Sequence, residues 1–242
     1  MKVTDKILVK INRIDAGNVF GYDSLGITSD DVIAASKALS RLVDKGIIKR
    51  VKKGFYYKPK ITVFGEVKPR EDAMLSTYLF DNKKQVAYIT GTRLYNRLGL
   101  TTQISTSIRI ASSDKQVKGK VGNVIVKPAK SYVKVTNDNV TYLELLDVIK
   151  DLNSIPDLEK SDGLLYLKKT ISSYDSSKTK KLVSYGILYP PKVRALLGAL
   201  LEVIDANGLA YQTLKKTINP SSSYEFGISA KLLPTANSWN IT

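Results

Sequence analysis

The chain has 242 residues, with 38 Lys and Arg against 22 Asp and Glu, which gives a net charge of +16. Hydrophobic residues make up 43% and charged residues 25%, as in globular domains, and at roughly 100 to 200 residues per domain we expect one or two domains. The excess of positive charge predicts a polyanionic partner, with nucleic acid first and an anionic membrane surface second.

The sequence contains no cysteine and no histidine. The lack of cysteine excludes a disulfide framework and thiolate metal sites. The lack of histidine excludes a Ser-His-Asp or Cys-His hydrolase and a zinc finger. No apolar run approaches about 18 residues, and charges interrupt the amino-terminal segment. We therefore expect neither a membrane span nor a signal peptide, and we expect the protein in the cytoplasm.

The first helix signal is an apolar stripe at helical spacing over residues 3–14. Glycines punctuate residues 15–26, where Val19–Phe20 predicts a short strand or core contact and 23–25 a very short helix.

A second amphipathic helix is predicted from about Thr28 to Lys45, with Thr28 or Ser29 as its N-cap and Gly46 as its C-cap. The predicted buried stripe consists of Val32, Ala35, Leu39, Leu42 and Val43. The predicted exposed face consists of Ala34, Lys37, Ala38, Arg41 and Lys45. Small residues let a helix approach a surface and basic residues reach out from it, as a helix entering the DNA major groove requires.

After Gly46, the residues "IIKRV" predict a strand, "KKG" a turn and "FYYKP" a returning strand that Pro59 ends. A hairpin directly after such a helix is the wing of a winged helix-turn-helix. Seven basic residues lie between Arg41 and Lys58, and we interpret them as a phosphate-contact surface beside a groove-reading helix. The alternative is a solvated edge whose charges discourage strand pairing.

These patterns give two sets of candidate DNA-binding residues. In the recognition helix they are Ser29, Ser36, Lys37, Ser40, Arg41 and Lys45, with Lys37 and Arg41 as the leading candidates for base contacts. In the wing they are Lys49, Arg50, Lys52, Lys53, Tyr56 and Lys58. Of Tyr56 and Tyr57, which alternate faces on a strand, we expect one in the core, and the other is a candidate for a phosphate contact. We assign Val32, Leu39, Leu42 and Ile47 to the core.

The rest of the chain predicts a second domain. Residues 58–72 contain two prolines and a glycine and are a linker candidate, although "ITVF" is also compatible with a strand. Strand patterns then precede helical patterns, which dominate from about Asn139. We therefore predict the α+β class, with a winged helix-turn-helix domain over 1–60 and a larger mixed domain over 61–242.

Two motifs are candidates for catalysis. The segment "ITGTR" (89–93) resembles an anion cradle at a helix start but lacks the Gly-Lys-Ser/Thr of a phosphate loop. Asp147 and Asp151 lie one helical turn apart, with Lys150 between them and no further acidic cluster. We expect no enzyme, no cofactor and no metal. An enzyme acting on nucleic acid is the alternative, and it requires that mutation of these aspartates abolish activity with binding intact.

Several segments resemble the AbiEi-type antitoxins of type IV toxin–antitoxin systems. In the amino-terminal part the resemblance is carried by "GNVFGYDSLGITSDDVIAASKALSRLVDKGIIKRVKKGFYYKP", which has a Gly-Ile-Ile step and a Gly-x-Tyr wing strand. Further on it is carried by "YITGTRLYNRLGLTTQISTSIRIAS", "RALLGALLE" and "INPSSSYEFGIS". The resemblance extends over nearly the whole chain and is weakest at residues 115–185.

The resemblance implies a bacterial protein that acts in defence against phage by abortive infection and whose two domains have different functions. The amino-terminal winged helix would repress the system's own promoter. Since bacterial winged helices often read inverted repeats, we expect two copies on this double-stranded DNA. The second domain would neutralise a nucleotidyltransferase-like toxin encoded nearby, through a functional rather than a stable complex. The alternatives are a stand-alone transcriptional regulator with no toxin, and an RNA or membrane-surface binder.

Overall fold

The computed structural model describes residues 3–242, which divide into two compact units. Unit 1 runs to Lys84 and also includes Lys118–Val126, and unit 2 consists of Gln85–Val117 and Lys127–Thr242. Both units contain helices and strands, which confirms the α+β class. The division differs from the boundary expected at residue 60, because residues 61–84 and 118–126 make most of their contacts within unit 1.

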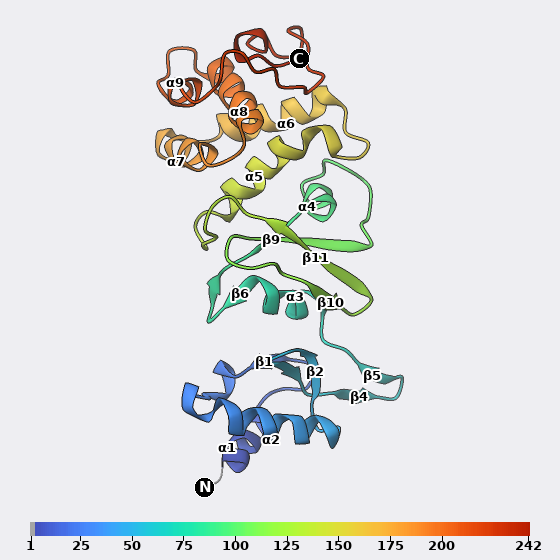
Figure 1. The fold of residues 1–242 in the computed structure, drawn as a ribbon. Coiled ribbons are helices and arrows are strands. Elements are labelled where there is room, and N and C mark those ends of the chain that lie inside the picture. Colours follow the sequence, from blue (N-terminus) through green and yellow to red (C-terminus); the bar gives the residue numbers. More distant parts are fainter. Residues whose placement is uncertain (1–2) are drawn as a thin grey trace. The chain divides into compact units, whose positions relative to one another are not determined.

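Unit 1 begins with two helices and a three-stranded antiparallel sheet of order β1-β3-β2 (Figure 1). The elements are α1 (Val3–Asn12), β1 (Val19–Gly21), η1 (Asp23–Leu25), η2 (Ser29–Asp31), α2 (Val32–Asp44), β2 (Lys49–Lys52) and β3 (Phe55–Tyr57). The α-helix starts at Val32, later than predicted, because Ser29–Asp31 forms a separate 3-10 turn.

The apolar side chains of α1, α2 and the sheet form one core. Its buried members are Ile7, Ile11, Phe20, Leu25, Ala35, Ala38, Leu39, Leu42, Ile48 and Tyr56. The placement of Ala38 on the exposed face was wrong, since α2 also packs against α1 and its buried stripe is wider than predicted. The assignment of Ile47 to the core was also wrong. Ile47 is 38% exposed and Ile48 is completely buried, because neighbouring residues of extended backbone point to opposite sides.

The linker candidate at residues 58–72 instead contains a hairpin of β4 (Lys60–Thr62) and β5 (Gly65–Val67). It is followed by α3 (Glu71–Leu79) and by a short hairpin of β6 (Phe80–Asp81) and β7 (Lys84–Gln85). The strand β10 (Gly119–Val121) packs against α3, and the Tyr78 hydroxyl donates a hydrogen bond to the Lys120 carbonyl oxygen.

Unit 2 combines strands with a larger group of helices. Its elements are β8 (Tyr88–Thr90), α4 (Thr92–Arg97), β9 (Ser107–Ser112), α5 (Val140–Asp151), η3 (Leu152–Ser154), α6 (Lys160–Ser172), α7 (Ser176–Gly186), α8 (Pro191–Ile204), α9 (Ala210–Lys215) and η4 (Asn237–Trp239). The boundary between the two units falls inside the strand β11 (Val124–Lys130), and within unit 2 the strands β8 and β9 pair antiparallel.

The core of unit 2 is centred on α8, which is buried along most of its length. The indole of Trp239 is completely buried, and a Cβ atom added at Gly198 would lie only 2.1 Å from it. Its ring nitrogen donates a 2.5 Å hydrogen bond to Glu202. A parallel bridge between Tyr224 and Ile241 fixes the chain end on the domain, as predicted for the tail. Within residues 3–242, no helix combines the length and the apolar character needed to cross a membrane.

Candidate functional site

The helix α2 presents a row of cations to solvent. Lys37, Arg41 and Lys45 are exposed, and their spacing of four residues places them along one face of the helix. The exposed Asp44 is the one acidic residue between Lys37 and Lys45 in the sequence, and within the described part of the chain none of the three cations forms an ion pair with it or with any other residue. This face therefore carries positive charge that the protein itself does not neutralise.

The three serine candidates contribute less to this face. Ser29 lies in the 3-10 turn before α2, and its hydroxyl donates a 3.3 Å hydrogen bond to the Asp30 carboxylate. Ser36 and Ser40 lie on α2 and are half-buried. The exposed surface of α2 consequently depends on the basic residues more than on the hydroxyls.

The hairpin of β2 and β3 adds two further cations. Lys53 lies in the turn beside Gly54, whose φ of +83° permits the tight reversal, and Lys53 is exposed. Arg50 is also exposed, and its guanidinium lies 5.6 Å from the centre of the Tyr56 ring, where a cation–π contact holds it. Neither of the two forms an ion pair among residues 3–242.

Lys52 and Tyr56 point away from the surface that we predicted for them. Tyr56 is only 1% exposed because it packs in the core, so its expected phosphate contact was wrong. The Lys52 ammonium donates to the Thr77 carbonyl oxygen and lies 4.0 Å from the centre of the Tyr78 ring. A register shift between Arg50 and Lys52 marks a β-bulge, a feature that redirects side chains.

The remaining wing candidates, Lys49 and Lys58, are engaged within unit 1. Lys49 forms an ion pair with Glu66 of β5, and the half-buried Lys58 reaches the Asn12 carbonyl oxygen at 3.5 Å. Tyr57, the other tyrosine of β3, is also buried and donates a 2.8 Å hydrogen bond to Glu66. Neither tyrosine is therefore free to contact a phosphate.

These contacts shift two pKa values. Burial and the neighbouring Glu66 raise the pKa of the Tyr57 hydroxyl to about 12. Hydrogen bonds from Lys49 and Tyr57 lower the pKa of the Glu66 carboxyl below its ordinary value. At neutral pH, Glu66 is therefore a charged acceptor that joins β5 to the three-stranded sheet.

Unit 2 contains a polar cluster around Asp147, whose carboxylate is completely buried. It accepts hydrogen bonds from the Tyr88 hydroxyl at 2.9 Å, the Thr90 hydroxyl at 2.6 Å and the Lys150 ammonium at 2.5 Å. Burial, followed by the nearby aspartate charge, raises the pKa of Tyr88, which keeps its hydroxyl protonated as a donor. The Asp147 carboxylate is therefore satisfied by the protein, which is typical of a structural group.

Asp151 has its own donors on the same helix face. Its carboxylate accepts a 2.6 Å hydrogen bond from the Tyr95 hydroxyl and lies 3.8 Å from the Arg109 guanidinium. The predicted strand–glycine–helix pattern at 89–93 is present, with Gly91 at φ +74°. Within residues 3–242, no three acidic side chains come together as metal ligands. The sequence analysis missed this cluster, and the signals available for it were the shared strand face of Tyr88 and Thr90 and the interruption of an apolar stripe by Asp147.

A cavity of about 700 Å³ lies elsewhere in unit 2. Apolar side chains from α6, α7 and α8 line it, among them Ile171, Val183 and Leu201, together with the charged residues Lys180 and Asp205. None of the residues predicted from the sequence as binding sites lies there.

Comparison with solved structures finds the crystal structure of the RV2827C protein from Mycobacterium tuberculosis, with 12% sequence identity and a TM-score of 0.47. The alignment covers 90% of this chain and 81% of that chain. No curated protein matches the sequence. The family described as DUF6088, a family of unknown function, matches residues 6–157. Since this match covers more than half of the chain, the protein belongs to the DUF6088 family.

Proposed function

We propose that the protein binds double-stranded DNA and represses its own promoter, with α1, α2 and the β1-β3-β2 sheet acting as a winged helix-turn-helix. The observation that carries the proposal is a set of exposed cations on two consecutive elements, none of which forms an ion pair within the described residues. They are Lys37, Arg41, Lys45, Arg50 and Lys53. Unneutralised cations of this kind suit the phosphates of a duplex.

The spacing of the α2 cations fits a groove-reading helix. Lys37 and Lys45 are eight residues apart, which corresponds to about 12 Å along a helix axis. At about 3.4 Å per base pair, this length corresponds to three to four base pairs. We assign Arg41, at the middle of the row, to a base contact, because its guanidinium can bond a guanine edge with two donors. Arg50 and Lys53 would contact phosphates beside the groove.

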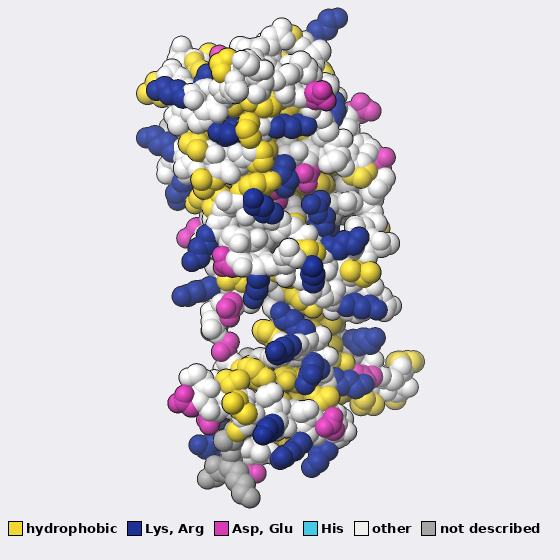
Figure 2. Space-filling model, in the orientation of Figure 1, with side chains coloured by type: hydrophobic (Ala, Val, Ile, Leu, Met, Phe, Trp, Pro, Cys, Tyr) yellow, Lys and Arg dark blue, Asp and Glu magenta, His cyan; other side chains and the backbone are white. Residues whose placement is uncertain are grey.

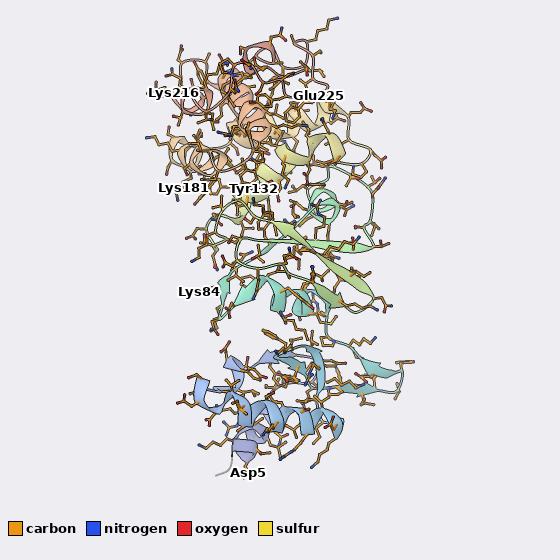
Figure 3. All side chains as sticks on the ribbon, in the orientation of Figure 1. Asp5, Lys84, Tyr132, Lys181, Lys216 and Glu225 are labelled. Carbon is orange, nitrogen blue, oxygen red and sulfur yellow. The ribbon has the colours of Figure 1, made fainter. Side chains whose placement is uncertain are left out.

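The decisive experiment measures binding by fluorescence anisotropy to the chain's own upstream DNA and to a shuffled duplex. The helix variant is Lys37→Ala/Arg41→Ala, and the hairpin variant is Arg50→Ala/Lys53→Ala. The matched control is Lys178→Ala/Lys181→Ala, which removes the same charge from exposed positions of α7, the helix on which Figure 3 labels Lys181. Lys52 is left intact, because it contacts Thr77 inside unit 1.

We expect wild type and the control to prefer the upstream DNA. The helix variant should lose this preference, and the hairpin variant should weaken binding to both duplexes alike. Equal binding of wild type to both duplexes, or no binding to either, would contradict the proposal. Competition with RNA and anionic vesicles separates it from the other polyanion-binding functions.

We extend the proposal to a second role, the neutralisation of a nucleotidyltransferase-like toxin by unit 2. Its support is the resemblance of residues 88–112 and of the α8 segment to AbiEi-type antitoxins. The test expresses the neighbouring gene alone, with wild type and with the Lys37→Ala/Arg41→Ala variant. We expect growth arrest from the gene alone and rescue by both proteins. If expression of the neighbouring gene alone does not arrest growth, the antitoxin role is contradicted and the stand-alone transcriptional regulator is the remaining function.

A further inference from the structure

The hairpin of β4 and β5 ends in two nearly uncovered apolar side chains. Val63 is 95% and Phe64 98% exposed, and Ile61 on the strand before them is 73% exposed. Figure 2 shows hydrophobic side chains gathered at the end of this hairpin, at the lower right of the view. Because these side chains stay in contact with water in the folded protein, they contribute almost no hydrophobic free energy to its stability.

The turn itself does not require these residues. Two-residue hairpin turns favour Asn, Asp and Gly, and the neighbouring β2–β3 hairpin follows this preference at one of its two turn positions, Gly54. In the β4–β5 hairpin, Gly65 supplies the positive φ of +102°, and the Thr62 hydroxyl bonds the Gly65 carbonyl oxygen at 2.9 Å. The backbone reversal is thus complete without any contribution from the side chains of Val63 and Phe64.

The hairpin is also held in place. The Glu66 carboxylate of β5 accepts a hydrogen bond from Tyr57 of β3 and pairs with Lys49 of β2. Both strands of the β2–β3 hairpin are therefore joined to the hairpin that carries the apolar tip. A tip fixed in this way can act as a wedge with little loss of conformational freedom on binding.

The stem below the tip is basic. Lys60 and Lys68 are both exposed at the base of the hairpin, because Lys60 is the register partner of Val67, the residue before Lys68. The acidic residue of the hairpin, Glu66, is already neutralised by Lys49. An apolar tip on a cationic stem is complementary to a duplex, whose stacked bases are apolar and whose backbone is anionic.

We propose that Phe64, assisted by Val63, wedges between base pairs in the minor groove next to the segment contacted by α2 and the β2–β3 hairpin. The insertion unstacks one base step and bends the duplex, while Lys60 and Lys68 contact the flanking phosphates. This inference rests on the proposed DNA-binding function. We assign the tip to DNA because the β4–β5 hairpin is joined to the β2–β3 hairpin, which carries the proposed phosphate contacts Arg50 and Lys53.

The test uses the full chain and upstream duplexes with a fluorophore at each end, so that energy transfer reports bending. A second series places 2-aminopurine at each adenine in turn, because its fluorescence rises on unstacking. The tip variant is Val63→Ser/Phe64→Ser, and Phe64→Leu keeps an apolar wedge. The matched control is Ile104→Ser, which removes an apolar side chain that is 89% exposed in unit 2.

We expect wild type, Phe64→Leu and the control to bend the DNA and to raise 2-aminopurine fluorescence at one step. The tip variant should lose both signals and bind about 10-fold to 100-fold more weakly, since a base–aromatic contact contributes that much. All four proteins should melt at the same temperature, because the replaced side chains are exposed.

Two results separate this inference from the function on which it rests. If wild type prefers upstream DNA but the tip variant binds and bends it equally well, the wedge is overturned and the DNA-binding proposal stands. If wild type binds no DNA, both are overturned. Two further results, each with DNA bending unchanged in the tip variant, would also overturn the wedge. If the tip variant no longer binds anionic vesicles that wild type binds, the tip is a membrane contact. If light scattering shows that the tip variant has lost a dimer that wild type forms, the tip contacts a second copy of the chain.

Discussion

Two regions of the molecule, the exposed face of α2 with the β2–β3 hairpin in unit 1 and the cluster around Asp147 in unit 2, use charged side chains in opposite ways. In unit 1, Lys37, Arg41 and Lys53 are exposed and form no ion pair with any of residues 3–242. In unit 2, Asp147 is completely buried and accepts hydrogen bonds from Tyr88, Thr90 and Lys150. A charge satisfied inside the protein contributes to the structure, whereas a charge left unsatisfied at the surface is available to an external partner.

This contrast separates stability from binding. Removing a buried charge leaves its donors without an acceptor, so the folded state loses free energy. Removing an exposed cation leaves the folded state nearly unchanged and affects only what the cation contacts outside. Each of the following experiments tests one side of this contrast.

The largest effect is expected from Asp147→Ala. The Tyr88 and Thr90 hydroxyls lose this acceptor, and the Lys150 ammonium keeps only the more distant Asp151 carboxylate at 3.9 Å. Loss of one partner of a buried ion pair typically costs about 3–5 kcal/mol. Urea unfolding followed by circular dichroism measures this loss of unfolding free energy. The control Asp138→Ala removes an exposed carboxylate of unit 2 and should change little. A loss below about 1 kcal/mol for Asp147→Ala would contradict the structural role of this group.

The next effect concerns the salt dependence of DNA affinity. If about five phosphates are neutralised, log Kd should vary with log salt with a slope near 4.5, and raising salt from about 50 to 200 mM should weaken binding several hundred-fold. The Arg50→Ala/Lys53→Ala variant should reduce this slope by about 1.8, at roughly 0.9 per phosphate. Anisotropy titrations at several salt concentrations measure it. A slope that does not change would remove these two residues from the interface.

A smaller effect distinguishes charge from geometry at Arg41. Arg41→Lys keeps the charge but loses the two-donor geometry of the guanidinium, so it should bind the shuffled duplex as wild type does. Its preference for upstream DNA should fall by about 1–3 kcal/mol, as should that of Arg41→Ala. Anisotropy titrations of wild type and both variants measure this preference as the ratio of the Kd for the shuffled duplex to the Kd for the upstream duplex. Retained preference in Arg41→Lys would show that Arg41 contacts a phosphate and not a base.

The contrast between the units also explains what the sequence could predict. The helix α2 and the strands β2 and β3 follow from local periodicity and turn residues, which act over a few positions. The errors at Ala38 and Lys52 arose from contacts with α1 and α3, partners that no local pattern contains. The Asp147 cluster joins residues 57 and 59 positions apart, so only the fold brings its members together.

The smallest effect should come from Tyr57→Phe and depends on pH. Burial and Glu66 raise the pKa of Tyr57 to about 12, above the ordinary value of 10.0, so the folded protein holds this proton more tightly than the unfolded chain. The stabilisation that this proton provides is therefore complete below pH 10 and is lost as the pH rises toward 12. Urea unfolding across this range should show the wild-type advantage over Tyr57→Phe shrinking with pH. In a Glu66→Gln background the advantage should shrink less, because the negative charge beside the hydroxyl is gone. An advantage independent of pH would mean that the Tyr57 hydroxyl does not join β3 to the β4–β5 hairpin through Glu66.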